Sequence, residues 1–85
     1  MDTKFSVALH ILTMISESKE ILSSQALAIS VGTNASYIRK VIALLKNADL
    51  IHSQQGKTGY QLSKSPKKMT LLEIYYATQD IKHIS

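Results

Sequence analysis

The 85-residue sequence contains no cysteine. This absence excludes disulfide bonds, cysteine-ligated zinc or iron–sulfur sites and cysteine nucleophiles from these residues. The chain also lacks an apolar run long enough to span a bilayer, and its start lacks the basic and apolar regions of an export signal. With one proline and three glycines, it has the composition of a folded protein, which we expect in the cytoplasm.

Carboxylates are scarce in the middle of the chain. Residues 36–68 hold seven lysine or arginine side chains and a single acid, Asp49, whereas each flanking segment has one more acid than bases. The formal net charge of +4 is therefore concentrated in one stretch. Such a distribution is typical of a surface that binds a polyanion, and a solvated basic surface without a partner is the alternative.

The chain is long enough for one small domain, and the first helix predicted in it is unusually apolar. From Thr3 to about Ser16, apolar residues recur every three or four positions. Val7, Ile11 and Met14 widen this apolar surface, so we expect burial on two sides. Either the helix is central to its own domain or, as we favour, one of these three residues contacts a partner subunit or a C-terminal helix.

Two further helices joined by a short turn follow. Ser23 or Ser24 can cap a short helix that ends between Ser30 and Gly32, and Asn34 can cap the next one. The second of these helices has an apolar stripe of Ile38, Val41, Ile42 and Leu45, opposite the small, polar or basic residues Ser36, Arg39, Lys40, Ala43 and Asn47. This pattern predicts a helix-turn-helix with a basic outer face.

A hairpin and a last helix complete the predicted order of elements. Residues 50–54 and 60–63 are two short extended segments around a glycine-containing turn, and residues 64–68 form a lysine-rich linker around Pro66. Thr70 and Glu73 have the spacing of a capping box, which predicts a helix from Leu71 to about Thr78. The fold class is therefore mainly α with a small β-hairpin, a winged helix-turn-helix of order H-H-H-β-β-H.

No arrangement of residues suggests catalysis or metal binding. The histidines His10, His52 and His83 lack metal-ligand spacing among themselves or with the few carboxylates, and no Ser/His/Asp set is evident. We therefore expect neither an enzyme nor a metal or organic cofactor.

The chain resembles the Rrf2 family of bacterial transcriptional regulators. The segments that carry the resemblance are KFSVALHIL at 4–12, the helix and turn at 23–32, NASYIRKV at 34–41, LLKNADLI at 44–51 and TLLEI at 70–74. It covers nearly all 85 residues and identifies 1–85 as a winged helix-turn-helix DNA-binding domain without the family's C-terminal dimerisation helix. The resemblance implies a sequence-specific, DNA-binding transcriptional regulator, and a protein-interaction or RNA-binding winged helix is the alternative.

The resemblance also implies where DNA would bind. The recognition helix, residues 34–48, would enter the major groove, and the wing, residues 51–63, would reach the minor groove or the backbone. The DNA-binding candidates are Ser24, Gln25, Ala35, Ser36, Tyr37, Arg39, Lys40, Gln54, Gln55, Gly56, Lys57 and Thr58. Among them Arg39 suits a guanine edge and Lys40 a phosphate, while Tyr37 either bonds phosphate or packs with Leu44. Lys64, Lys67 and Lys68 are additional candidates for phosphate contact.

Several positions depart from the family pattern. Gln55 precedes Gly56 where an arginine is usual, a single Gly59 precedes Tyr60, and Asp49 replaces the glycine that usually follows the recognition helix. Some members bind an iron–sulfur cluster through C-terminal cysteines, which this chain does not contain. The expected partners are double-stranded DNA with a pseudo-palindromic operator and, in the full-length protein, a second copy of the chain.

Overall fold

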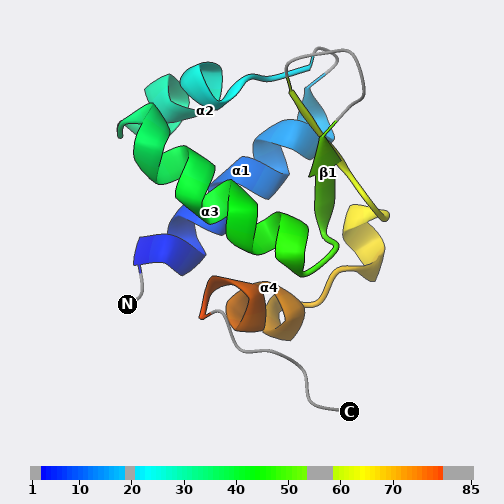
Figure 1. The fold of residues 1–85 in the computed structure, drawn as a ribbon. Helices are drawn as coiled ribbons and strands as arrows, with labels where there is room; N and C mark the ends of the chain where they lie inside the picture. The colour runs from blue at the N-terminus through cyan, green and yellow to red at the C-terminus, as the bar shows by residue number, and fades with distance from the viewer. Residues whose placement is uncertain (1–2, 19–20, 54–58, 80–85) are drawn as a thin grey trace.

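A computed structural model describes residues 3–18, 21–53 and 59–79 (Figure 1). Its elements are α1 (Thr3–Glu17), α2 (Ser24–Val31), α3 (Ala35–Asn47), β1 (Ile51–Ser53), β2 (Tyr60–Leu62), the 3₁₀ helix η1 (Pro66–Lys68) and α4 (Leu71–Thr78). The predicted order of helices and strands is confirmed. The linker around Pro66 contains a 3₁₀ turn, in which the Ser65 hydroxyl accepts a hydrogen bond from the Lys67 amide at 3.4 Å.

Helix α1 lies at the centre of the domain, in contact with α2, α3, α4 and β2. Val7 and Ile11 are 7% and 0% exposed, and Met14 is half-buried against the same core. The domain itself covers Val7 and Ile11, so the prediction that one of Val7, Ile11 and Met14 contacts a partner subunit or a C-terminal helix is wrong for these two and stays a prediction for Met14. Four elements around one helix account for its wide apolar surface.

Local interactions fix the helix-turn-helix. The Ser23 hydroxyl caps α2 by accepting from the Ala26 amide at 3.2 Å, so Ser23 and not Ser24 is the cap. Gly32 ends α2 with φ 84°, a left-handed conformation that glycine adopts without a steric cost. The Asn34 side chain then caps α3 by accepting from the Tyr37 amide at 2.8 Å. These contacts set the direction in which α3 leaves the turn.

The hairpin is short and pairs Ile51 with Leu62, and Ser53 with Tyr60, in antiparallel register. Asp49 at the end of α3 has φ 61°, a conformation that glycine would adopt at lower cost. Just before β2, Gly59 is buried, and a Cβ added to it would lie 1.7 Å from Ile21 Cγ2. The second strand is therefore held tightly against the segment before α2.

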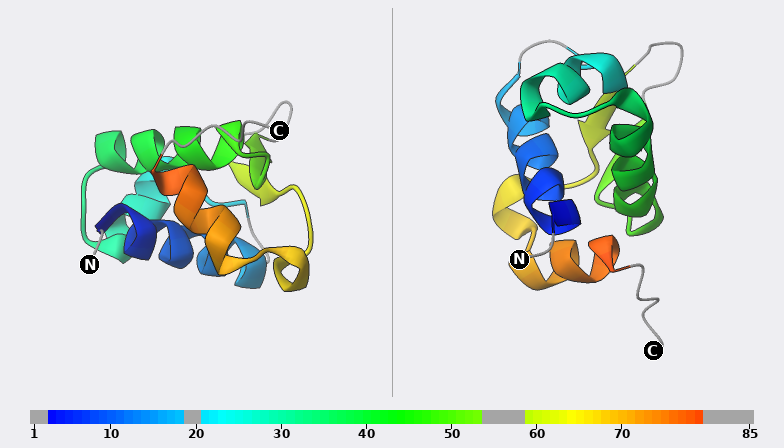
Figure 2. Two further views of the ribbon diagram at one scale, coloured as in Figure 1. Left: turned by 90° about the horizontal axis from the view of Figure 1, so that it is seen from below. Right: turned by 90° about the vertical axis from the view of Figure 1, so that its left-hand side faces the viewer.

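The core extends from α1 through α3 to α4. Its fully buried large side chains include Ile11, Leu27, Ile38, Leu45, Leu50 and Ile51. Both views in Figure 2 show α3 and η1 on opposite sides of the molecule. The outer surface of α3 therefore points away from the lysine-rich 3₁₀ turn.

Candidate nucleic-acid interface

The outer surface of α3 carries cationic, polar and small side chains. Ser36, Arg39, Ala43 and Lys46 are all exposed and recur at three- and four-residue spacing, so they form one stripe along the helix. The α3 segment contains no carboxylate. Because Ala43 has no side chain beyond Cβ, the middle of this stripe permits a close approach by a partner surface.

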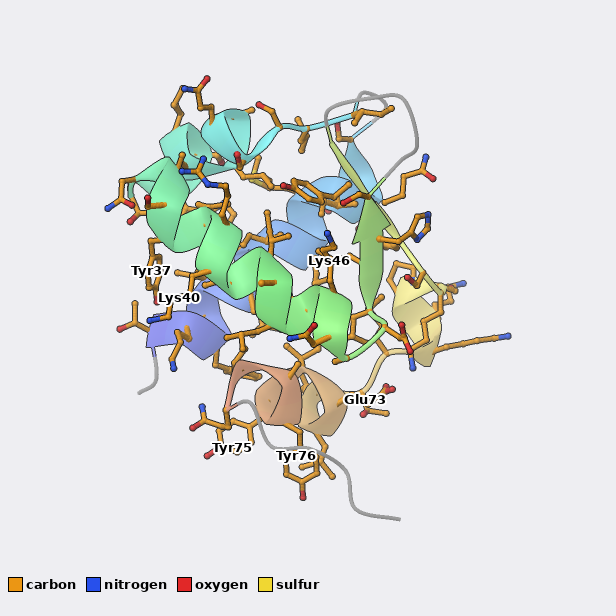
Figure 3. The ribbon with its side chains drawn as sticks, in the orientation of Figure 1. Tyr37, Lys40, Lys46, Glu73, Tyr75 and Tyr76 are labelled. Carbon is orange, nitrogen blue, oxygen red and sulfur yellow. The ribbon has the colours of Figure 1, made fainter. Side chains whose placement is uncertain are left out.

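Arg39 and Lys40 provide neighbouring cations on α3, as predicted. The Arg39 guanidinium donates to the Ser36 hydroxyl at 3.5 Å, a long contact that leaves most of its donors free for another partner. Lys40 is exposed on the side of α3 that carries Tyr37 (Figure 3). The two cations thus point to different sides of the same exposed surface.

Ala35 and Tyr37 lie at the edge of this surface. Both are half-buried and pack against the hydrophobic core, although the Tyr37 ring points outward in Figure 3. Both interpretations of Tyr37, a hydrogen bond to phosphate and packing with Leu44, stay predictions.

Helix α2 contributes the start of the helix-turn-helix motif. Gln25, in its first turn, is exposed, whereas Ser24 is half-buried as the first residue of the helix. α2 packs on α3. Gln25 is thus the more accessible of these two candidates.

The predicted tip of the wing, Gln54, Gln55, Gly56, Lys57 and Thr58, lies outside the described residues. The described part of the hairpin ends at Ser53 on one strand and begins again at Gly59 before the other. Ser53 is exposed, and its hydroxyl accepts a hydrogen bond from Lys46 Nζ at 3.0 Å. This bond joins the last turn of α3 to the wing.

Lys46 was not among the residues singled out from the sequence. It lies seven residues after Arg39, so helical periodicity alone places the two on one side of α3. The bond to Ser53 required knowledge of the hairpin packing and was not visible in the sequence. In Figure 3 Lys46 lies between α3 and β1.

The lysines around Pro66 occupy a different region. Lys64 forms an ion pair with Glu73 on α4, and Lys67 and Lys68 belong to η1, on the side of the molecule opposite α3 (Figure 2). The hydrogen bond from Lys64, together with that from the Thr70 amide, lowers the pKa of the Glu73 carboxyl below its ordinary value. These three lysines therefore do not extend the outer surface of α3.

Helix α4 exposes apolar and aromatic side chains. Leu71, Leu72, Tyr75 and Tyr76 are 65%, 57%, 43% and 39% exposed. Tyr75 contacts Phe5 of α1 edge-on, with ring centroids 5.9 Å apart. Beside α4, a shallow hollow of about 200 Å³ is lined largely by side chains of α1, β2, η1 and α4. We call the exposed residues Leu71, Leu72, Tyr75 and Tyr76 the α4 surface.

Within the described ranges, no group of three histidine, aspartate or glutamate residues lies close enough to hold a metal ion. His10 and His52 instead contact hydroxyl oxygens, of Ser30 at 3.3 Å and of Ser63 at 3.1 Å. None of the helices in the described ranges is both long and apolar enough to cross a membrane.

Comparisons with known proteins agree with this geometry. The profile of the Rrf2 family, described as an iron-dependent transcriptional regulator, matches residues 1–85. YwnA of Bacillus subtilis, named as an HTH-type transcriptional regulator, is 42% identical over 79 residues. That alignment covers 93% of this chain and 59% of YwnA, so the chain spans about three fifths of its relative.

Solved structures have the same fold. One crystal structure, described as that of a DNA-binding protein, is 44% identical with a TM-score of 0.85, and covers 91% of this chain and 66% of its own. CymR, described as the global cysteine regulator of B. subtilis, has a TM-score of 0.82 at 23% identity, with 93% and 63% covered. The winged-helix architecture predicted from the sequence is thus confirmed.

Proposed function

The chain belongs to the Rrf2 family of transcriptional regulators, and from this premise we propose that it binds double-stranded DNA in a sequence-specific manner. Members of this family are regulators and not enzymes. In the proposal, α3 is the recognition helix in the major groove, and the hairpin lies against the minor groove or the backbone. The candidates at the tip of the wing, Gln54 to Thr58, belong to the same proposal.

The observation that carries the proposal is the outer surface of α3. A major groove about 12 Å wide admits an α-helix, and affinity for DNA comes largely from cations that neutralise phosphates. The α3 surface offers Arg39, Lys40 and Lys46, a small residue at Ala43 and no carboxylate between Ala35 and Asn47. A helix with this composition suits a close approach to an anionic groove.

The family's description names iron, but the described residues offer no set of ligands for an iron ion. The 85 residues contain no cysteine, and the described residues bring no three potential ligands together. No step in the proposed function therefore depends on a metal.

Direct binding experiments test the proposal. The chain should bind labelled duplex DNA in fluorescence anisotropy, and the logarithm of its affinity should fall linearly as the logarithm of the salt concentration rises. Duplex RNA has a narrow major groove that side chains cannot read, so it should bind more weakly. Equal or tighter binding to RNA, or no binding to either duplex, would contradict DNA recognition and favour the RNA-binding or protein-interaction alternative.

Arg39 is the residue proposed to read a base. It is the only arginine in the chain, and a bidentate contact with guanine discriminates against a wrong base by about 1–3 kcal/mol. After an operator is selected from random duplexes, Arg39→Lys should reduce specificity more than it weakens non-specific binding, because lysine lacks the planar pair of donors. If specificity and non-specific affinity fall by the same factor, Arg39 contacts phosphate instead.

Assembly into a homodimer on a pseudo-palindromic operator is part of the same proposal. Two-fold dimers place their recognition helices about 34–36 Å apart, in successive major grooves. Since Val7 and Ile11 are buried inside the domain, we place the contact with a C-terminal helix or second subunit at the α4 surface. Sedimentation of a longer chain tests this, and a monomer that binds one half-site at full affinity would contradict it.

A bacterial, cytoplasmic location is also proposed, because the chromosome lies there.

A further inference from the structure

We infer that Lys46 and Ser53 together form a phosphate-binding pair at the junction of α3 and the wing. This inference rests on the proposed function, since the phosphate is one of the DNA backbone. It concerns two residues outside the set of DNA-binding candidates predicted from the sequence.

The first argument comes from hydrogen-bonding capacity. Lys46 Nζ carries three donors and uses one of them on Ser53 Oγ, at 3.0 Å. The Ser53 hydroxyl accepts that bond, so its own O–H is available to donate. Two N–H groups and one O–H thus lie within about 3 Å of each other, and both side chains are exposed. Phosphate oxygens accept several hydrogen bonds at once, which suits this set of donors.

The second argument comes from position along α3. Seven residues separate Arg39 from Lys46, which is about 10.5 Å at 1.5 Å per residue. This distance is close to the width of the major groove, about 12 Å. If Arg39 reaches base edges on the floor of the groove, Lys46 lies near the phosphates at its border. Ala43, between them, leaves space for the groove to approach.

The third argument comes from electrostatics. The C-terminal end of a helix carries a partial negative charge, which repels phosphate, and Asp49 adds a carboxylate just beyond α3. Lys46 is the cation of the last turn of α3. Its hydrogen bond to Ser53 holds this charge toward the wing. Lys46 therefore offsets the negative charge of the helix end and of Asp49 at the junction between helix and wing.

Salt-dependent binding to a short DNA duplex of mixed sequence distinguishes this role from a structural one. Loss of one phosphate contact lowers the slope of log affinity against log salt by about 0.9. Lys46→Ala and Lys46→Gln should both show this decrease, although glutamine retains a donor for Ser53. Ser53→Ala should weaken binding about two- to fivefold with a smaller change in slope, because the ammonium remains.

The Lys67→Ala, Lys68→Ala double variant is the control, since it removes lysines on the side opposite α3. Its slope should match that of the unchanged chain, and circular dichroism should show that every variant is folded. An unchanged slope in Lys46→Ala would overturn the inference while leaving the proposed function intact. If the unchanged chain shows no salt-dependent binding, the proposed function is overturned as well.

Discussion

The helices α3 and α4 are alike on their inner sides and opposite in character on their outer sides. Both are capped by a side chain, Asn34 for α3 and Thr70 for α4, and both bury apolar residues in the same core. The outer side of α3 carries Arg39, Lys40 and Lys46. The outer side of α4 carries two leucines and two tyrosines, each at least 39% exposed.

This difference shows that one small domain presents two chemically distinct surfaces. The α3 surface suits a hydrated polyanion. Binding of such a partner is driven by charge and weakens as the salt concentration rises. The α4 surface suits another apolar protein surface, because contiguous exposed leucine and tyrosine side chains are typical of interaction sites. Substitutions on one surface should therefore leave the function of the other unchanged.

The largest expected effect comes from a carboxylate in the middle of the α3 stripe. Ala43 is exposed, so Ala43→Glu should change the free energy of unfolding by less than about 0.5 kcal/mol. Because a like charge facing phosphate costs several kcal/mol, DNA affinity should fall by about 100-fold or more.

Two variants separate the causes of that loss. Ala43→Gln adds a side chain of similar size without the charge, and Tyr76→Glu places the charge on the α4 surface. The first should retain more affinity than Ala43→Glu, and the second should bind a single half-site normally in fluorescence anisotropy. An equal loss in Tyr76→Glu would show that the two surfaces are not independent.

A second effect concerns the hairpin beside α3. In Gly59→Ala the added Cβ would overlap Ile21 Cγ2 and lie 3.2 Å from the Leu22 carbonyl oxygen. Overpacking of this kind costs about 1–3 kcal/mol of unfolding free energy, which thermal unfolding would measure. Adding Ile21→Ala removes the overlapping atom, so the double variant should be more stable than the sum of the two single changes predicts.

The two caps test whether the helices contribute separately. Asn34→Ala and Thr70→Ala each remove a side-chain cap and should each cost about 1 kcal/mol, lowering the melting temperature by about 4–8 °C. Only Asn34→Ala should also weaken DNA binding at temperatures below the melting transition. Without the Asn34 cap, the first turn of α3 is less well ordered. A comparable loss of affinity in Thr70→Ala would contradict this assignment.

The smallest effect is the pH dependence contributed by Glu73. Its lowered pKa, caused first by the bond from Lys64, stabilises the fold at neutral pH, and this contribution is lost as the pH falls through the folded-state pKa. Glu73→Gln should therefore reduce the loss of stability between neutral pH and about pH 3, measured by urea unfolding. DNA affinity at neutral pH should not change. An unaltered pH dependence would show that the contacts made by Glu73 do not stabilise the fold.

Capping residues and helical periodicity were enough to predict the helices from the sequence. The cover of α1 and the position of η1 depend on tertiary packing and were not predicted. The capping box at Thr70 and Glu73 located the start of α4, and helical periodicity identified the buried and exposed sides of α3. The sequence did not show that Val7 and Ile11 are covered from within, because that depends on four elements meeting around α1. Nor did it separate Lys67 and Lys68 from α3, since only the fold places η1 on the opposite side.

The contact between Phe5 and Tyr75 has a consequence for synthesis of the protein. It joins α1 to α4, so α1 lacks part of its cover until the residues of α4 have been made. At about 5–20 residues per second, the apolar side of α1 waits several seconds for α4. We expect ribosome-bound chains that end before α4 to remain sensitive to protease, and chains in which α4 has emerged from the ribosome to become resistant. Resistance before α4 emerges would show that the first three helices and the hairpin fold without it.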